Sequence, residues 1–235
     1  MRAGRGRRDT GRESGPVSAA PQRRSPDGAR QRGGGTARIV VKLGGSLARD
    51  PLLAHWLREL ARSRSARFVV VPGGGPFADA VRTAQGVWQF SDEVAHVMAI
   101  GAMDQFGRML CGIEAAAVPC STRVRIEKAW ADGRLPVWLP SRVMARDRQL
   151  ARSWDVTSDT VAAWLGDALG ADGLLLVKCC GLSSDRLSPA LLATSGIVDP
   201  SLPGFLSRSG LALQVAQKER WSELSEFVTR LQCRT

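Results

Sequence analysis

Lysine is scarce in this chain, and two of the four lysines stand where a lysine could act on a transferring phosphoryl group. The sequence holds 29 Arg but only four Lys, and Lys42 and Lys178 each come at the end of an apolar run that predicts a buried strand. Ligands of open α/β folds bind at the carboxyl ends of strands, and the compact lysine ammonium can approach a phosphoryl group closely. We therefore predict a catalytic role for both lysines, with a merely solvated lysine as the alternative at each position.

Two glycine turns follow directly after apolar runs. The first run, RIVVKLGGS at 38–46, contains Gly44 and Gly45, and the second, RFVVVPGGGPFAD at 67–79, contains three glycines that begin at Gly73. A strand that ends in bare backbone and leads into a helix presents unpaired N–H groups, which bind anions. Neither turn matches the P-loop or the GxGxxG pattern. Two such turns, with a lysine two residues before the first, nevertheless indicate phosphate chemistry.

A carboxylate that could hold both lysines lies in the segment SWDVTSD at 153–159. Asp155 is expected in the loop before a helix and Asp159 in its first turn, where a carboxylate stabilises the helix by roughly 1 kcal/mol. Such a role in the helix start could by itself account for Asp159. If Asp159 lies between Lys42 and Lys178, it can also hold both ammonium groups in position to neutralise charge on a moving phosphoryl group.

Alternating strands and helices must position these residues. Apolar runs predict strands at 38–43, 68–71, 136–139, 174–177 and 211–215. Helices are predicted to open at Asp50-Pro51, to run from Ser91 to about Ile113, to run from Thr157 or Ser158 to Leu169, and to cover 219–231. The order of strand, helix and strand predicts parallel pairing with right-handed crossovers. We therefore expect an α/β fold, a three-layer αβα sandwich with a mainly parallel open sheet.

Length and composition bound the organisation of the chain. With 235 residues it is long enough for one α/β domain with a full core. Residues 1–35 carry nine Arg against three acidic residues and almost no apolar side chains, so we expect a disordered Arg/Gly-rich tail there. Residues 36–235 are expected to form the folded domain, with an acceptor-binding half at 36–150 and a shortened nucleotide-binding half at 151–235.

Composition also restricts location and partners. The five cysteines show no CxxC spacing, and no apolar run reaches the roughly 18 residues of a membrane span. We expect a cytoplasmic protein with reduced thiols, no membrane partner and no metal ligand set of its own. The wide apolar stripe of the 91–113 helix predicts a homodimer or higher homo-oligomer. Nucleic acid is not expected as a partner, because the basic excess lies in the tail and the body offers no base-reading element.

The order of the motifs resembles that of the amino-acid kinase family. VVKLGGS, VVVPGGGPFAD, the DVTSD helix entry and LGADGLLLVKCCGL occur in the family's order, so the resemblance covers the chain from Arg38 to about Leu231. It implies an eight-stranded αβα sandwich that uses ATP and Mg²⁺ to phosphorylate a carboxylate or phosphate oxygen. The residue roles that it implies are ATP-phosphate contacts from Lys42, Gly44, Gly45 and Ser46, organisation of the lysines by Asp159, and acceptor contacts from Gly73, Gly74, Gly75 and Asp155.

Within that family, SWDVTSD and the segment SDEVAHVMAIGAMDQFG are most similar to members that phosphorylate an (aminomethyl)furan phosphate in methanofuran synthesis. The resemblance therefore implies a small-molecule acceptor that carries a phosphate and an amine, in cofactor biosynthesis. An ammonium group favours carboxylates, and Asp79, Asp104 and Asp155 are available. Arg82 could hold the acceptor's phosphate, or it could be a solvated helix residue.

Two departures from the family pattern keep a second hypothesis open. Many members carry a second catalytic lysine in a late GGMxxK segment, whereas this chain has GIVDPSLPGFLSRSG at 196–210, and its part after Gly181 is short. Lys178 is then expected to contact the nucleotide in place of that lysine. The alternative is a non-catalytic nucleotide-binding, ligand-binding or storage protein that keeps the same fold.

Overall fold

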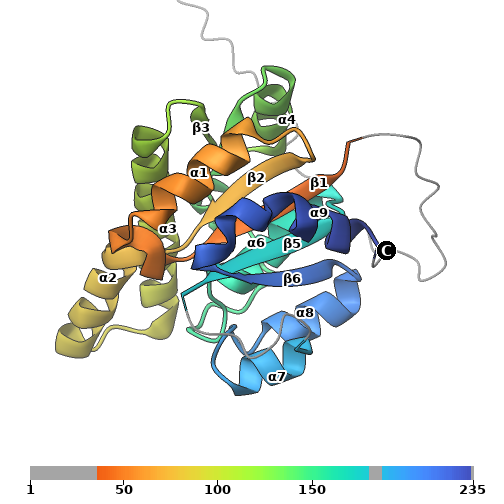
Figure 1. Cartoon of the computed structure of the whole chain (residues 1–235). Helices are drawn as coiled ribbons and strands as arrows, with labels where there is room; N and C mark the ends of the chain where they lie inside the picture. The colour runs from red at the N-terminus through yellow and green to blue at the C-terminus, as the bar shows by residue number, and fades with distance from the viewer. Residues whose placement is uncertain (1–35, 180–186, 234–235) are drawn as a thin grey trace, which may run out of the picture. The chain divides into compact units, whose positions relative to one another are not determined.

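A six-stranded parallel sheet is the centre of the structure (Figure 1). The computed structural model describes residues 36–179 and 187–233, so the tail expected at 1–35 lies outside the described residues. In sheet order the strands are β3 (Ala117–Cys120), β4 (Leu135–Trp138), β2 (Arg67–Pro72), β1 (Arg38–Leu43), β5 (Gly173–Lys178) and β6 (Ala212–Gln217). All neighbouring strands are parallel. The predicted fold class is confirmed, although the described residues form six strands rather than the eight that the resemblance implies.

Helices cover both faces of this sheet. They are α1 (Leu52–Arg62), α2 (Gly75–Trp88), α3 (Asp92–Ile113), α4 (Arg123–Ala131), α5 (Ser141–Met144), α6 (Ser158–Leu169), α7 (Pro189–Thr194), α8 (Leu202–Ser209) and α9 (Leu224–Gln232), with 3₁₀ turns at Gly45–Arg49 and Lys218–Glu223. In Figure 1, α1 and α9 lie in front of the sheet and α6 lies behind it. No helix in the described parts of the chain combines the length and the apolar character needed to cross a membrane.

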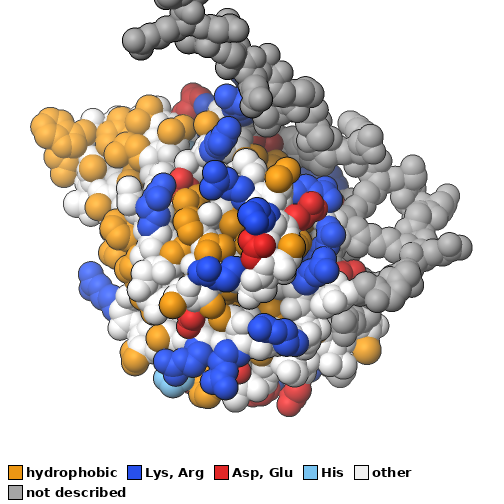
Figure 2. All heavy atoms as spheres, turned by 90° about the horizontal axis from the view of Figure 1, so that it is seen from above, with side chains coloured by type: hydrophobic (Ala, Val, Ile, Leu, Met, Phe, Trp, Pro, Cys, Tyr) orange, Lys and Arg blue, Asp and Glu red, His pale blue; other side chains and the backbone are white. Residues whose placement is uncertain are grey.

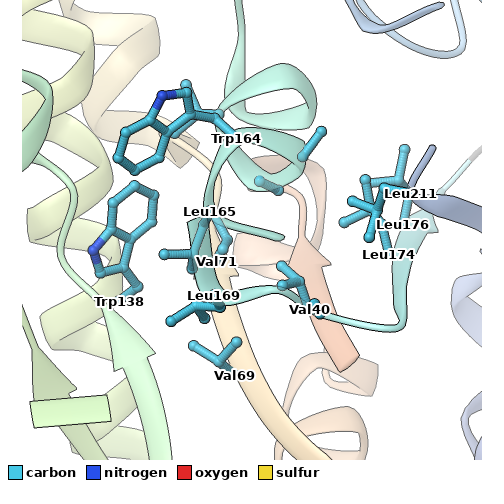
Figure 3. Packing of buried hydrophobic residues seen from close by; sticks show 14 of the residues in the cluster. Val40, Val69, Val71, Trp138, Trp164, Leu165, Leu169, Leu174, Leu176 and Leu211 are labelled. Atoms are coloured by element: carbon cyan, nitrogen blue, oxygen red, sulfur yellow. The ribbon is translucent and has the colours of Figure 1, made fainter. Parts of the chain in front are cut away.

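The central strands are apolar along their length because each of their faces is buried. Side chains alternate between the two faces of a strand, so Ile39 and Val41 join a core cluster with Trp56 of α1 and Phe227 of α9. Val40 of the same strand joins the opposite cluster. Figure 3 shows that second cluster, with Val40 between Leu165 and Leu169 of α6 on one side and Leu174, Leu176 and Leu211 on the other. One cluster joins the sheet to the helices on one face and the other cluster joins it to the helices on the opposite face, which gives the three layers of the predicted sandwich.

The predicted strands and most predicted helices are found within two residues of the expected positions. The helix expected at 219–231 is wrong in its first part, because Lys218–Glu223 is a 3₁₀ turn with a non-helical Arg220 and the α-helix begins only at Leu224. Contacts with α1 and with the residue that ends the turn before it explain this: Trp56 Nε1 donates to Lys218 O at 2.8 Å, and Lys218 Nζ contacts Asp50 Oδ2 at 2.5 Å. β3, α4, α5, α7 and α8 were not predicted from the sequence.

Candidate active site

Lys42 and Lys178 lie on the two central strands, at the edge of the sheet where the strands end. Lys42 of β1 is in register with Leu176 of β5, and Lys178 is the last residue of β5. Both lysines continue the alternation that places Val40, Leu174 and Leu176 under α6. Lys42 is buried, with only 7% of its surface exposed. The two ammonium groups are therefore brought to the same face of the sheet, where α6 begins.

Asp159 lies between the two ammonium groups. Thr157 is the N-cap of α6, and its hydroxyl accepts a hydrogen bond from the Asp159 N–H at 3.5 Å, which places Asp159 in the first turn. The carboxylate contacts Lys42 Nζ through Oδ1 at 2.9 Å and Lys178 Nζ through Oδ2 at 2.6 Å. Asp159 is only 3% exposed. The structure thus brings together the three residues that the sequence selects as catalytic.

Opposite charges in close contact determine the protonation states of this cluster, which we call the Lys–Asp–Lys triad. Burial on its own would raise the pKa of Asp159, but Lys42 and Lys178 together outweigh burial and hold that pKa below its usual value. Burial and the charge of Lys42 lower the pKa of Lys178, and Asp159 opposes this only in part. With all three groups ionised the triad carries one net positive charge, which favours an anionic ligand.

The two glycine turns contact each other through their backbones, beside the triad. A Cβ on Gly45 would lie 2.4 Å from the backbone nitrogen of Gly75, and a Cβ on Gly73 would lie 2.6 Å from the nitrogen of Gly45. Gly75 also has a φ of +56°, in the left-handed region that favours glycine. A Cβ on Gly44 would lie 3.2 Å from Lys42 Nζ, so the missing side chain leaves that ammonium open.

A cleft of about 940 Å³ contains the triad and both turns. Its lining includes the predicted nucleotide and acceptor residues Lys42, Gly44, Gly45, Ser46, Gly74, Gly75, Asp79, Asp159 and Lys178. A second wall comes from 195–200, between α7 and α8. A smaller and mainly apolar cavity of about 540 Å³ lies among α7, α8 and β6, and it contains none of the predicted site residues. Because phosphate chemistry requires the charged triad, we take the larger cleft as the candidate active site.

Three residues considered from the sequence lie apart from this cleft. Asp155 is exposed and is not among the residues that line the cleft. Gly73 does not line it either, but its backbone packs against Gly45. Asp104 accepts hydrogen bonds from the N–H of Ser141 at 3.1 Å and from its hydroxyl at 2.5 Å, so this carboxylate anchors the start of α5.

Arg82 lines the cleft from α2 and has two partners. Its Nη1 donates to Asp79 Oδ1 at 3.0 Å, and its guanidinium lies 4.5 Å from the ring centre of Trp154. Trp154 is held in turn by a hydrogen bond from its Nε1 to Gln85 Oε1 at 2.8 Å. Stacking on an aromatic ring orients a guanidinium. Arg82 is therefore an oriented cation at the end of the cleft formed by α2.

Asp199 lines the cleft and is 5% exposed, although it was not predicted from the sequence as a site residue. Its carboxylate accepts hydrogen bonds from the backbone N–H and the hydroxyl of Thr157 and of Thr160. A usable signal was present, because Asp199-Pro200 stands just before an apolar helical segment, a pattern typical of a helix start.

The residues present fit a nucleoside triphosphate better than a metal ion alone. Two buried lysines and bare glycine backbone suit phosphate oxygens, and the open space at Gly44 lies directly beside Lys42 Nζ. Within residues 36–179 and 187–233, no group of three or more His, Cys, Asp or Glu could hold a metal ion. Mg²⁺ commonly binds through substrate phosphates with few protein ligands. Such an ion would therefore enter this site together with the nucleotide.

Comparison with known proteins agrees with this geometry. The sequence profile of the amino acid kinase family matches residues 37–179, which is more than half of the chain. The chain belongs to the amino acid kinase family. Family membership confirms the resemblance on which the sequence analysis relied, and the matched residues include all three members of the triad.

One curated relative within the family has a named activity. Over 135 residues the chain is 32% identical to the [5-(aminomethyl)furan-3-yl]methyl phosphate kinase of Methanocaldococcus jannaschii. The matched region covers 55% of this chain and 60% of that relative, so it spans less than two thirds of the relative's length. The name of this relative supports the prediction of a phosphotransferase.

Solved structures of family members share the fold. The uridylate kinase of Archaeoglobus fulgidus has a TM-score of 0.60 at 18% identity, and 80% of this chain aligns with 95% of that one. The UMP kinase of Bacillus anthracis has a TM-score of 0.63 at 14% identity, with 83% and 93% covered. For the aspartate kinase of Synechocystis the TM-score is 0.58 at 16% identity, with 77% and 38% covered. At these identities the likeness supports the architecture alone.

Proposed function

We propose that this protein is an ATP-dependent small-molecule kinase that transfers the γ-phosphoryl group of ATP to a phosphate or carboxylate oxygen. The observation that carries the proposal is the bridging of Lys42 and Lys178 by buried Asp159, at 2.9 and 2.6 Å, inside the cleft that contains both glycine turns. Membership in the amino acid kinase family supports the reaction class.

The chain's own residues act by position and charge. In the reaction a bond forms between the acceptor oxygen and the γ-phosphorus, and the bond to the oxygen that bridges the β- and γ-phosphorus breaks. Lys42 and Lys178 would neutralise charge that develops on the transferring group, while Asp159 keeps the two ammonium groups apart and in place. Bound Mg²⁺ would add positive charge on the phosphates. No covalent bond to the protein is required.

For the acceptor we propose an amine-bearing furan phosphate, of the kind named for the relative in Methanocaldococcus jannaschii. Two groups that line the cleft support this choice: the Asp79 carboxylate could accept an ammonium group, and the oriented Arg82 guanidinium could bind a phosphate. The family resemblance also implies that Asp155 contacts the acceptor, and this contact stays a proposal. Asp155 is exposed and is not among the residues that line the cleft.

We also propose a homodimer built on α2 and α3. Seven of the nine large apolar side chains that are exposed in the described chain lie on these two helices, namely Phe77, Val87, Trp88, Val94, Val97, Met98 and Ile113; the other two are Val124 of α4 and Leu191 of α7. Figure 2 shows hydrophobic side chains gathered at one end of this face of the molecule. Contiguous exposed apolar surface is typical of interaction sites. A cytoplasmic location stays a prediction from the sequence.

The proposed function is tested by following ATP consumption with Mg²⁺ and a panel of acceptors: the furan phosphate, isopentenyl phosphate, acetylglutamate, aspartate and carbamate. Lys42→Met should lower kcat by roughly a hundredfold to a thousandfold, because it removes a charge that acts on the transferring group, yet it leaves Asp159 paired with Lys178. Lys128→Met is the matched control, since Lys128 is exposed and pairs with Asp132 on α4.

Each outcome of this assay has a definite meaning. Turnover on one acceptor that disappears in Lys42→Met and persists in Lys128→Met would support the kinase and identify its substrate. Turnover that survives Lys42→Met would contradict the proposed mechanism. ATP binding without turnover on any acceptor would favour the non-catalytic alternative.

A further inference from the structure

Asp199 connects a wall of the cleft to the start of α6. Its Oδ2 accepts from the Thr157 N–H at 3.0 Å, the Thr157 hydroxyl at 2.9 Å and the Thr160 N–H at 3.0 Å. Its Oδ1 accepts from the Thr160 hydroxyl at 2.5 Å and from the Leu202 N–H at 3.0 Å. One buried carboxylate thus binds five donors and joins the first turns of α6 and α8.

These contacts occupy the end of α6 that would otherwise attract a phosphate. The first N–H groups of a helix lack partners within the helix, and the helix dipole favours an anion beside them. Here the Asp199 carboxylate is that anion, because it accepts from the backbone of both Thr157 and Thr160. The N–H groups of Thr157 and Thr160 are therefore already paired with Asp199 and are not open to a phosphate.

The same contacts fix the orientation of Asp159. Thr157 lies two residues before Asp159 and Thr160 one residue after it, so Asp199 holds the backbone on both sides. A turn held on both sides cannot rotate about the helix axis without breaking several hydrogen bonds. The two carboxylate oxygens of Asp159 can face two different lysines only while the first turn of α6 keeps this orientation about the helix axis.

We propose that Asp199 is a positioning residue for phosphoryl transfer, which holds the first turn of α6 so that Asp159 bridges Lys42 and Lys178. It acts through Asp159 rather than on the reacting atoms. The kinetic part of this inference rests on the proposed function, whereas its structural part rests on the hydrogen bonds alone.

The negative charge of Asp199 also affects the pKa of Lys178, which an uncharged residue with the same hydrogen bonds would not do. Within the described residues, the charged groups that act on Lys178 are Lys42 from β1, Asp159 from α6, and Asp199 from the segment before α8. Burial and Lys42 lower the pKa of Lys178, while Asp159 and Asp199 raise it. Loss of the Asp199 charge should therefore lower the pKa of Lys178 further, so that Lys178 loses its proton at a lower pH.

The test compares Asp199→Asn with Asp104→Asn. Both substitutions keep the side-chain size and remove a carboxylate that anchors a helix start, but Asp104 lies outside the cleft lining. The first readout is lysine NMR with a ¹³Cε label, which needs no substrate and is tractable because the chain has four lysines. In Asp199→Asn we expect the Lys42 and Lys178 signals to move and Lys178 to titrate at lower pH; in Asp104→Asn both should match the wild type.

The second readout is the pH dependence of turnover. Asp199→Asn should lower kcat by roughly tenfold to a hundredfold, because small displacements of catalytic groups have effects of that size. The KM for ATP should stay within about threefold, and the alkaline decline of kcat should move to lower pH. A folded Asp199→Asn variant with wild-type lysine signals and wild-type kcat would overturn the inference.

A second variant covers the case in which Asp199→Asn does not fold. Thr160→Val removes the hydrogen bond to Asp199 Oδ1 but keeps the charge. It should move the Lys42 and Lys178 signals while the titration of Lys178 stays near that of the wild type; unchanged signals would overturn the inference. If the wild type transfers no phosphoryl group, the proposed function fails, and the lysine spectra still decide the role of Asp199.

Discussion

At the scale of single residues, the charge balance of the triad decides which substitution is informative. Replacing either lysine by Met leaves one ammonium paired with Asp159, which is a neutral pair. Replacing Asp159 by Asn leaves two buried ammonium groups in the same site, with no carboxylate between them. A buried charge without a partner destabilises the folded state far more than a buried lysine and aspartate that neutralise each other. The two kinds of variant should therefore differ in stability as well as in activity.

We expect Asp159→Asn to lose about 3 kcal/mol of unfolding free energy at pH 7, and to recover part of it at pH 9.5. The sign follows from proton binding. Burial and the charge of Lys42 already lower the pKa of Lys178, and removal of Asp159 takes away the carboxylate that opposes this. The unfolded variant therefore binds more protons than the folded one, and its stability rises with pH. Urea unfolding at the two pH values measures this. A loss that is the same at both values, or that grows with pH, would contradict the argument; Asp79→Asn, at an exposed ion pair, should change little.

At the scale of elements, the two strand-to-helix turns are specified by their mutual contact. Gly45 opens a 3₁₀ turn and Gly75 opens α2, and the two backbones approach so closely that a Cβ on Gly45 would lie 2.4 Å from the Gly75 nitrogen. An added Cβ on Gly45 would meet backbone atoms of Gly75, and no flexible side chain lies between them that could move aside. The approach draws the ends of β1 and β2 together at the cleft, which is why both turns line it.

Gly45→Ala should therefore destabilise the protein by about 1–3 kcal/mol and reduce ATP binding, because the two glycine turns that line the cleft would have to move apart. The control is Gly86→Ala in α2, where nothing lies within 4 Å of the added Cβ. That substitution should stabilise the protein by up to about 1 kcal/mol, since alanine favours a helix interior more than glycine does. Thermal unfolding and nucleotide titration of both variants measure the difference. Equal effects of the two substitutions would refute the close packing of the turns.

At the scale of the whole molecule, the exposed apolar side chains of α2 and α3 predict how copies of the chain associate. α3 was expected to use one wide stripe for both the core and a subunit contact. The structure divides it: Ile100, Met103 and Phe106 are buried, whereas Val97 and Met98 are exposed. Val87 and Trp88 are exposed on α2, which packs against α3, so the exposed side chains of the two helices are treated as one candidate interface.

Val97→Glu should weaken self-association at least tenfold, because a dimer through α3 would bury an unpaired carboxylate. Val124→Glu is the control, since Val124 is even more exposed but lies on α4, outside this surface. Light scattering coupled to size exclusion should give twice the chain mass of 25.2 kDa for the wild type and for Val124→Glu, and a mass close to 25.2 kDa for Val97→Glu. A monomeric wild type would exclude the proposed dimer.

The sequence by itself determined the features that depend on local order. Apolar runs that end in glycine located β1 and β2, the Thr157 cap located α6, and two strand-end lysines with Asp159 located the triad, because strand ends, caps and turns are written in neighbouring residues. The division of the 219–231 segment into a turn and α9 could not be read in this way, since it depends on contacts with Trp56 and Asp50 in α1 and the turn before it.

Only the tertiary structure decided which residues act together across long distances in the chain. It placed Asp199 against Thr157 and Thr160, about forty residues earlier, and it tied Asp104 to Ser141 instead of the cleft. It also left Asp155 exposed and outside the cleft lining, although the resemblance implied that Asp155 contacts the acceptor. Hydrogen bonds between distant segments leave no periodic or spacing signal. The three residues of the Lys–Asp–Lys triad could therefore be selected from the sequence, whereas their hydrogen-bonded neighbours from distant segments could not.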